Sequence, residues 1–158
     1  MPQFDQDKIT KLVSELRTSV KRLRHLSKLP QNDFVADPDK IGSAKYHFIV
    51  AIESCIDMGN HVIARNGFRV PENYGDTFRV MAEAGVFEND FSQELRNMAK
   101  FRNRLVHLYW EVDDKQVHEI LRNRLDDFKM FLDKLSMFLG WGNEGKPDPY
   151  SIEFKKLQ

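Results

Sequence analysis

The residues from Phe101 to Asp113 carry the side chains of this sequence that are best suited to chemistry. They read F-R-N-R-L-V-H-L-Y-W-E-V-D and bring an arginine, an asparagine, a histidine and a tyrosine close together. A guanidinium can bind a phosphate group through paired hydrogen bonds, and an imidazole can carry a proton near neutral pH. This combination predicts a site that handles a phosphate and a proton.

Helical spacing relates these side chains to one another. Asn103 and His107 are four residues apart, so in an α-helix they lie on one face, and the amide can hold one nitrogen of the ring. Arg102 and Tyr109 are seven residues apart and are expected to share a second stripe. His107 lies about 140° around the helix axis from Arg102. A second element, or the same helix of a second copy, is therefore expected to complete the site.

Each of these residues also has an ordinary interpretation. A single histidine in a helix is more often a surface or hydrogen-bonded residue than a catalyst, and a single arginine is usually a solvated charge. Helix geometry alone leaves both interpretations open.

A polar row on an earlier segment is a candidate for one wall of the site. The members of this row that could face the motif are Asp57, Asn60 and His61. Glu53 lies on the same helical stripe, since it precedes Asp57 by four residues, but a solvated surface position is the simpler interpretation for it. The alternative for the whole row is an exposed polar face with a weak pairing between Asp57 and His61.

A basic row overlaps the motif. Arg96, Lys100 and Arg104 recur every four residues and therefore lie on one helical face. They are candidates for phosphate contacts, and plain solvation explains them equally well.

The elements that must position these residues are predicted to be helices. Apolar residues recur at spacings of three and four in four long segments, residues 5–29, 37–67, 91–109 and 113–139. A shorter helix is expected over residues 76–84, whereas residues 30–36 are expected to form a loop. These elements predict an all-α fold, an antiparallel bundle of four to five helices over residues 1–140. Residues 141–158 lack a helical period and are expected to be irregular or packed on a partner.

Individual residues predict where the helices begin and end. Asp37 followed by Pro38 is a start signal, and Gly67 and Gly140 are stop signals. Asn89 or Asp90 is expected to cap the motif helix, and Asp113 with Gln116 has capping-box spacing. Gly59 lies inside a helix, where glycine costs about 1 kcal/mol relative to alanine, so a close approach by another group is expected there.

Length and composition favour one domain without a strong overall charge. A chain of 158 residues that is 41% hydrophobic can bury one core. Its 24 basic residues balance 24 acidic ones, so any contact with nucleic acid must be local. The single Cys55 suits a reducing compartment. We find no signal peptide and no membrane-spanning run, so a cytoplasmic protein without membrane contact is expected.

Other common chemistries have no signature in the sequence. There is no HExxH motif, no Cys and His cluster with zinc spacing, and no glycine-rich phosphate loop. Neither a metal nor a cofactor is therefore expected.

The motif and its flanking segments resemble the HEPN domains of the HepT-like toxin family. The residues from Arg102 to Tyr109 match the R-x4-H-x-Y signature of that family. Three more segments agree in order, namely A-I-E-S-C-I-D-M-G-N-H-V-I over residues 51–63, P-E-N-Y-G-D-T-F over residues 71–78, and Gly85-Val86. The agreement covers residues 5–140 and leaves the C-terminal tail outside it.

The resemblance implies a toxin of a type II toxin–antitoxin pair that acts as a metal-independent endoribonuclease. The family's active site is a cleft between two protomers, so a two-fold dimer or a higher oligomer is implied. Arg102 would bind the scissile phosphate of RNA, His107 would act as general acid or base, and Asn103 would orient His107. In such an enzyme, the basic row of Arg96, Lys100 and Arg104, found from its spacing, is the candidate for further RNA phosphate contacts. The candidates for the cleft wall are Asp57, Asn60 and His61.

The resemblance also implies a partner. HepT-like toxins are paired with a nucleotidyltransferase (MntA-like) antitoxin, which in part of the family transfers AMP to the tyrosine of the signature, here Tyr109. The alternative is a non-catalytic HEPN protein that binds a nucleotide or docks a nucleotidyltransferase. The near-zero net charge favours this alternative, whereas the complete set of four polar residues in the signature favours the enzyme.

Overall fold

The structure, a computed structural model, describes residues 2–141. Of the C-terminal tail that is expected to be irregular or packed on a partner, residues 142–158 lie outside the described residues.

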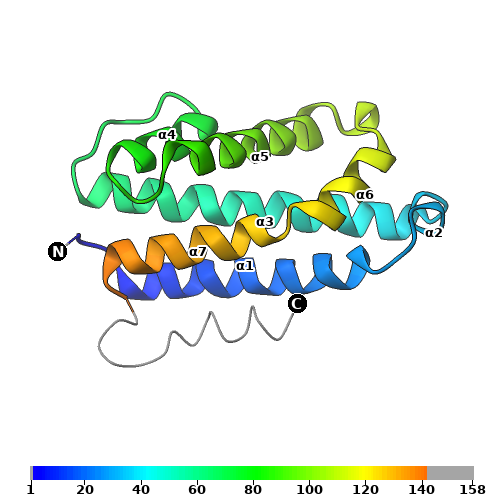
Figure 1. Cartoon of the computed structure of the whole chain (residues 1–158), viewed down its shortest axis with the longest axis horizontal. Helices are drawn as coiled ribbons and strands as arrows, with labels where there is room; N and C mark the ends of the chain where they lie inside the picture. Colours follow the sequence, from blue (N-terminus) through cyan, green and yellow to red (C-terminus); the bar gives the residue numbers. More distant parts are fainter. Residues whose placement is uncertain (1, 142–158) are drawn as a thin grey trace.

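The described residues form α-helices and one short 3-10 helix, and no strand occurs among them (Figure 1). The α-helices are α1 (Gln6–Ser27), α2 (Gln31–Val35), α3 (Pro38–Arg65), α4 (Tyr74–Glu83), α5 (Asn89–His107), α6 (Asp114–Asn123) and α7 (Asp126–Leu139). The 3-10 helix η1 (Tyr109–Glu111) follows α5. The predicted all-α class is confirmed.

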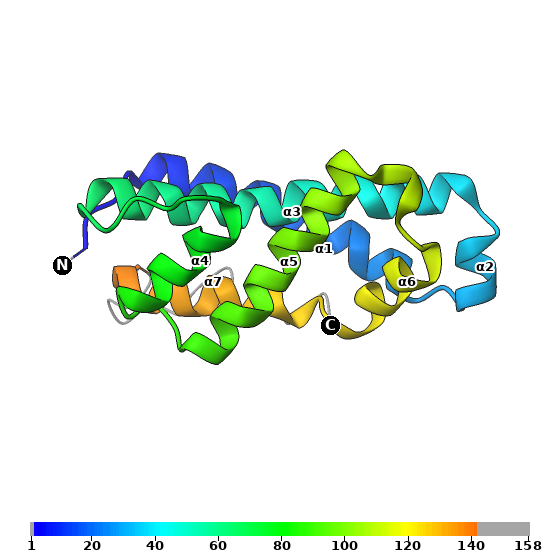
Figure 2. The same cartoon turned by 90° about the horizontal axis from the view of Figure 1, so that it is seen from above.

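The long helix α3 is the central support of the bundle. It packs along α1 on one side and is covered by α4 and α5 on the other, while α7 runs beside α1 (Figure 1). Viewed from above, α5 crosses α3 at an angle (Figure 2). The C-terminal half of α5 lies against the N-terminal half of α3, since Phe101 packs edge-on against Phe48 with ring centroids 5.3 Å apart. This contact fixes the motif helix on the core.

Large aromatic side chains fill the interior. Five phenylalanines are fully buried, namely Phe34, Phe48, Phe78, Phe128 and Phe131. Burial of each such side chain contributes about 1.5–3 kcal/mol of transfer free energy. The free Cys55 is also buried, and burial raises the pKa of its thiol, which makes it an unreactive core residue.

Several predicted helix signals are confirmed. The carboxylate of Asp37 accepts hydrogen bonds from the backbone N–H groups of Asp39 and Lys40 and caps α3. Gly67 and Gly140 follow helix ends in the left-handed region, with φ of 66° and 67°, a conformation that glycine adopts without steric cost.

Gly59 allows α4 to approach α3 closely. A Cβ atom at this position would lie 2.7 Å from Sδ of Met81 and 2.9 Å from Cγ2 of Thr77. The predicted close approach is therefore confirmed, and it is made by side chains of α4.

Three local predictions are wrong. Residues 31–35, expected to lie in a loop, form α2, whose Phe34 is buried. The N-cap of α5 is Glu88, not Asn89 or Asp90, and no side chain caps this end. The helix expected over residues 113–139 is divided into α6 and α7. Both helices contact α1 and α3, and α6 also packs on α2.

The predicted capping box at the start of α6 is also not formed. The Asp113 carboxylate accepts from the backbone N–H of Lys115. The side-chain oxygen of Gln116 instead accepts from Nη1 of Arg104 at 3.0 Å, so this glutamine joins α6 to the motif helix.

Candidate functional site

Arg102 lies where three helices meet. Its Nε and Nη2 donate to one carboxylate oxygen of Glu53 on α3, at 2.9 and 2.6 Å. Its Nη1 donates to Oδ1 of Asn103 at 3.1 Å. The guanidinium carbon lies 4.8 Å from the ring centroid of Tyr74 at the start of α4, within the range of a cation–π contact. Contacts from α3, α4 and α5 therefore fix the position of this side chain.

The contacts of Arg102 leave part of its hydrogen-bonding capacity unused within the described residues. A guanidinium has five N–H donors, and the bonds to Glu53 and Asn103 use one each on Nε, Nη1 and Nη2. The side chain is 13% exposed, while that of Glu53 is 40% exposed. A phosphate that binds here must use the remaining N–H groups or displace the more exposed carboxylate.

His107 is the last residue of α5 and is exposed. The expected hydrogen bond from Asn103 to His107 is not formed between these described residues, and the amide oxygen instead accepts from Arg102. Arginine and asparagine of the motif are thus brought together, and the imidazole lies apart from them at the helix end.

Tyr109 does not continue the stripe of Arg102, so this prediction is wrong. The helix ends two residues earlier, because Leu108 has φ of −130° and ψ of 39°, and Tyr109 begins η1. Its ring instead packs against Lys45 of α3, whose Nζ lies 4.2 Å from the ring centroid. A Cβ atom at Gly42 would lie 4.0 Å from the tyrosine hydroxyl, so the phenol lies along the first turns of α3.

Lys45 joins α3 to the end of the motif. It is buried although it is charged, and its Nζ donates to the backbone carbonyl of Tyr109 at 3.2 Å. A carboxylate oxygen of Asp114 lies 3.5 Å from the same nitrogen. These contacts compensate the buried charge and fix the position of η1 on α3.

The three residues expected in the cleft wall have different surroundings. Asp57 is exposed, and its pKa is raised by partial burial and by the nearby Glu53 carboxylate. Asn60 accepts a hydrogen bond from the Thr77 hydroxyl at 2.8 Å. His61 is buried, and its Nε2 accepts from the backbone N–H of Asp5 at 2.8 Å. The structure therefore places Asn60 against α4 and His61 at the start of α1, and neither contacts the motif.

The pKa of His61 is lowered from its usual value. Burial is the main cause, and the positive charges of Lys8 and Arg65 add to it. This favours the neutral imidazole that accepts the hydrogen bond from Asp5.

The basic row of α5 is divided between two cavities. Arg96 and Lys100 line a cavity of about 480 Å³ between α4 and α5, together with Asn103. Arg104 lines a second cavity, also of about 480 Å³, between α5 and α6. Lys100 contributes to both. The row thus does not act as one continuous surface.

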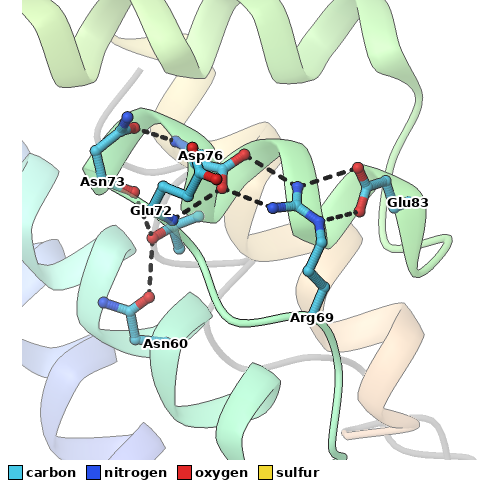
Figure 3. A network of polar contacts seen from close by, with 7 residues as sticks. Asn60, Arg69, Glu72, Asn73, Asp76 and Glu83 are labelled. Carbon is cyan, nitrogen blue, oxygen red and sulfur yellow. Dashed lines mark hydrogen bonds and ion pairs between the residues drawn. The ribbon is translucent and has the colours of Figure 1, made fainter.

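A polar network holds the segment that carries Tyr74 (Figure 3). Arg69 donates to both carboxylate oxygens of Asp76, at 2.8 and 3.0 Å, and to both oxygens of Glu83, each at 3.1 Å. The Arg69 guanidinium is the main cause that lowers the pKa of Asp76 to about 2, and the backbone N–H of Glu72 adds to it. The connection between α3 and α4 is therefore fixed.

Sequence reasoning missed Tyr74 and Lys45, which position the motif from other helices. Its interpretation of Glu53 as a solvated surface position is wrong, because Glu53 accepts two hydrogen bonds from Arg102. Glu53 shares a stripe with Asp57, and this spacing was the available signal for it. Tyr74 belongs to the family-like segment over residues 71–78, but nothing in its spacing indicates that it packs against Arg102. Lys45 could not be found, because it contacts a residue more than sixty positions away.

Two general properties follow from the described range. Among residues 2–141, no group of three or more His, Cys, Asp or Glu side chains is arranged to hold a metal ion. No helix in this range combines the length and apolar character needed to cross a membrane.

The sequence of this chain is similar to those of proteins described as ribonucleases. Residues 16–135 match a family model described as "Ribonuclease HepT-like". The chain is 31% identical over 81 residues to the "mRNA nuclease HepT" of Shewanella oneidensis, a match that covers 51% of this chain and 61% of that protein. It is 28% identical over 92 residues to a "Putative RNase" of Archaeoglobus fulgidus, covering 58% and 67%. The chain thus spans less than two thirds of the Shewanella relative.

Solved structures share the fold. A "tri-AMPylated Shewanella oneidensis HEPN toxin in complex with MNT antitoxin" superposes with a TM-score of 0.78 at 24% identity, over 84% of this chain and 99% of that one. A toxin–antitoxin structure with AMP-PNP gives a TM-score of 0.76 at 24% identity, over 83% and 99%. The cytosolic protein YutE of Bacillus subtilis, described as of unknown function, gives 0.75 at 18% identity, over 95% and 99%.

Proposed function

We propose, because this chain belongs to the HepT-like ribonuclease family, that it is a metal-independent endoribonuclease and the toxin of a toxin–antitoxin pair. The observation that carries the proposal is Arg102, which contacts from three helices hold in place and which still has N–H donors for an anion. These donors are what a non-bridging phosphate oxygen requires.

The residues of the motif suit cleavage by the ribose 2′-hydroxyl. His107, whose imidazole is exposed, takes the proton of the hydroxyl as the 2′-oxygen attacks phosphorus, or gives a proton to the departing 5′-oxygen as the P–O5′ bond breaks. Arg102 binds the non-bridging oxygens and stabilises the charge that develops on them. Asn103, bonded to the guanidinium, positions Arg102 and not His107 in this form of the site.

A second copy of the chain would complete the site. The imidazole lies at the end of α5 and forms no hydrogen bond with Arg102 among the described residues, so a two-fold axis that brings two α5 helices together would supply both groups to one phosphate. Exposed apolar side chains support such a contact, since Val106 is 41%, Leu108 48% and Trp110 92% exposed at this end. Exposed large apolar side chains that lie this near to one another in the sequence are consistent with an interface.

The proposed antitoxin is a nucleotidyltransferase, like the MNT antitoxin that accompanies the Shewanella toxin described above. We propose that it acts on Tyr109 by transferring AMP to the hydroxyl. The added group would lie beside η1 and the first turns of α3. Its bulk and negative charge would therefore obstruct the end of α5 near His107, and not Arg102 directly.

Cleavage of RNA by the purified protein tests the proposal. Arg102→Ala and His107→Ala are expected to lose activity, while the matched controls Arg22→Ala and His25→Ala, exposed positions on α1, are expected to retain it. Equal cleavage by all five proteins, the parent included, would show that the motif is not the active site.

A non-catalytic function is the second candidate, and Glu53 favours it. This carboxylate occupies Nε and Nη2 of Arg102, the edge that a phosphate would otherwise use. Glu53→Gln removes its charge and discriminates the candidates. An enzyme should keep or gain activity, whereas a docking protein should cleave no RNA in either form and still bind the nucleotidyltransferase.

A further inference from the structure

The cavity between α4 and α5 has the character of an anion site, and we name it the α4–α5 basin. Its volume is about 480 Å³, and three cationic side chains line it, Arg79 from α4 and Arg96 and Lys100 from α5. Arg79 was not among the residues singled out by the sequence, because it lies on a different helix from the basic row.

The cations of the basin, Arg79, Arg96 and Lys100, form no ion pairs among the described residues, 2–141. Nε of Arg96 is buried and has no hydrogen-bond partner in that range. A buried donor without a partner costs free energy, so an acceptor supplied by a ligand would stabilise this arrangement.

The acidic groups of the basin do not cancel this charge. Asp76 lines the basin, but both of its oxygens are bonded to Arg69, which lies outside the lining (Figure 3). The other carboxylate is that of Glu72, which is exposed. Asp76 also lies near enough to Arg79 for that cation to help lower the pKa of its carboxyl. Three basic side chains therefore share the basin with one carboxylate that is bonded to Arg69 and one that is exposed.

The basin leads to the motif. Asn103 lines it, and the Oδ1 atom of this residue accepts from Nη1 of Arg102. Arg96 and Asn103 are seven residues apart on α5, which corresponds to nearly two helical turns, so both lie on one stripe of the helix. The basin therefore follows this stripe from Arg96 to the residue that bonds Arg102, as an extended single strand would have to do.

We propose that the α4–α5 basin binds the phosphates of single-stranded RNA adjacent to the phosphate held by Arg102. The inference rests on the proposed ribonuclease function for its choice of ligand. It assigns Arg79 to the RNA surface and removes Arg104 from it, since Arg104 faces the other cavity and is bonded to Gln116.

Binding of an uncleavable RNA tests the basin separately from catalysis. The probe is a fluorescein-labelled, fully 2′-O-methylated RNA of mixed sequence and about 12 nucleotides, a length within the site sizes of single-strand binders. Fluorescence anisotropy gives the binding constant at several salt concentrations. The variant is Arg79→Gln/Arg96→Gln/Lys100→Gln, and the matched control is Lys21→Gln/Lys28→Gln/Lys134→Gln, which removes three exposed positive charges elsewhere.

The basin variant is expected to flatten the slope of log K against log salt by about 2, since each phosphate contact on a single strand contributes about 0.7. The control triple is expected to leave the slope unchanged. Equal slopes for the two triples would overturn the inference. If circular dichroism shows that the basin triple is unfolded, Arg79→Gln and Lys100→Gln are measured singly, each with an expected change of about 0.7.

Two further arms separate the possible outcomes. Competition with ATP tests whether the ligand is a free nucleotide. If ATP binding is lost in the basin triple while RNA binding is unaffected, the assignment to RNA is wrong. Cleavage of unmodified RNA by Arg102→Ala tests the proposed function independently. Normal cleavage by that variant with weakened RNA binding by the basin triple would refute the catalytic role of Arg102 and support the basin, whereas no cleavage by the parent protein would refute the ribonuclease function.

Discussion

Two arginines of this chain are held by carboxylates in different ways. Arg69 bonds both oxygens of Asp76 and both oxygens of Glu83 through four hydrogen bonds. Arg102 meets a single oxygen of Glu53 and one amide oxygen. The arginine with more hydrogen bonds is the more exposed one, since the side chain of Arg69 is 43% exposed and that of Arg102 is 13% exposed.

The difference separates an arginine that fixes a loop from one that is available to a ligand. Two carboxylates satisfy nearly every donor of Arg69, and the result is a fixed start of α4. Arg102 is more enclosed but less completely paired, and it is also packed on an aromatic ring. Burial with spare donors is unfavourable for folding alone, and such compromises concentrate at functional sites.

The largest expected contrast is in catalysis. Arg102→Ala should lower the rate of RNA cleavage by about 10²–10³-fold, the usual effect of removing one group that stabilises transition-state charge. Arg69→Ala should change the rate far less, because Arg69 acts through the position of α4. Single-turnover cleavage at saturating protein measures both. A loss of similar size in the two variants would remove the distinction.

The second contrast is in stability. Asp76→Asn should lower the free energy of unfolding by about 1–2 kcal/mol, because the nearly buried side chain loses charge-assisted hydrogen bonds, partly offset by solvent around its partner. Glu53→Gln should lower it less, since Glu53 offers only one oxygen and is 40% exposed. Urea unfolding compares the two. If Glu53→Gln proves to be the more destabilising, the interpretation of Arg102 as the less constrained arginine is contradicted.

The third contrast is in pH dependence. The folded pKa of Asp76 is about 2, below its usual value of 3.8, so its contribution is fully present above pH 4 and is lost as the pH falls through the folded value. The difference in unfolding free energy between the parent and Asp76→Asn should therefore shrink between pH 4 and pH 2. A difference that stays constant over this range would show that the ionised Asp76 carboxylate, paired with Arg69, does not contribute to the free energy of unfolding.

The smallest expected effect concerns the competition between Glu53 and phosphate. Glu53→Gln should tighten binding of the 2′-O-methylated RNA by about two- to fivefold, the equivalent of a partly exposed ion pair. Asp57→Asn is the control, since Asp57 lies on the same stripe but is not bonded to Arg102. Equal effects of the two substitutions would indicate a general charge effect in place of a specific competition.

The sequence was sufficient for features that depend on local patterns. Apolar periodicity placed the main helices, and Asp37, Gly67 and Gly140 marked their ends because capping and left-handed turns depend on a few neighbouring residues. The motif itself could also be located, since its spacing lies within two helical turns.

Features that depend on distant contacts could not be predicted. The division between α6 and α7 accompanies the packing of α6 on α2. The end of α5 at His107 is fixed by Lys45 of α3, which bonds the carbonyl of Tyr109. Asn103 was assigned to His107 because both lie on one face, but its neighbour Arg102 is the partner. Arg79 could not be assigned to the basin from the sequence, because it lines the cavity only through the packing of α4 against α5.

Lys45 connects the central helix α3 to the residues that follow α5. Its buried ammonium is compensated by the Tyr109 carbonyl, the Tyr109 ring and Asp114, all of which follow the motif helix. A bulky group attached to the tyrosine that displaced η1 would remove the carbonyl and the ring that compensate this cation and leave Asp114 as its partner, which would weaken the contact between the end of the motif helix and α3. A covalent mark at one surface hydroxyl would then register as a lower melting temperature and faster proteolysis of the entire protein.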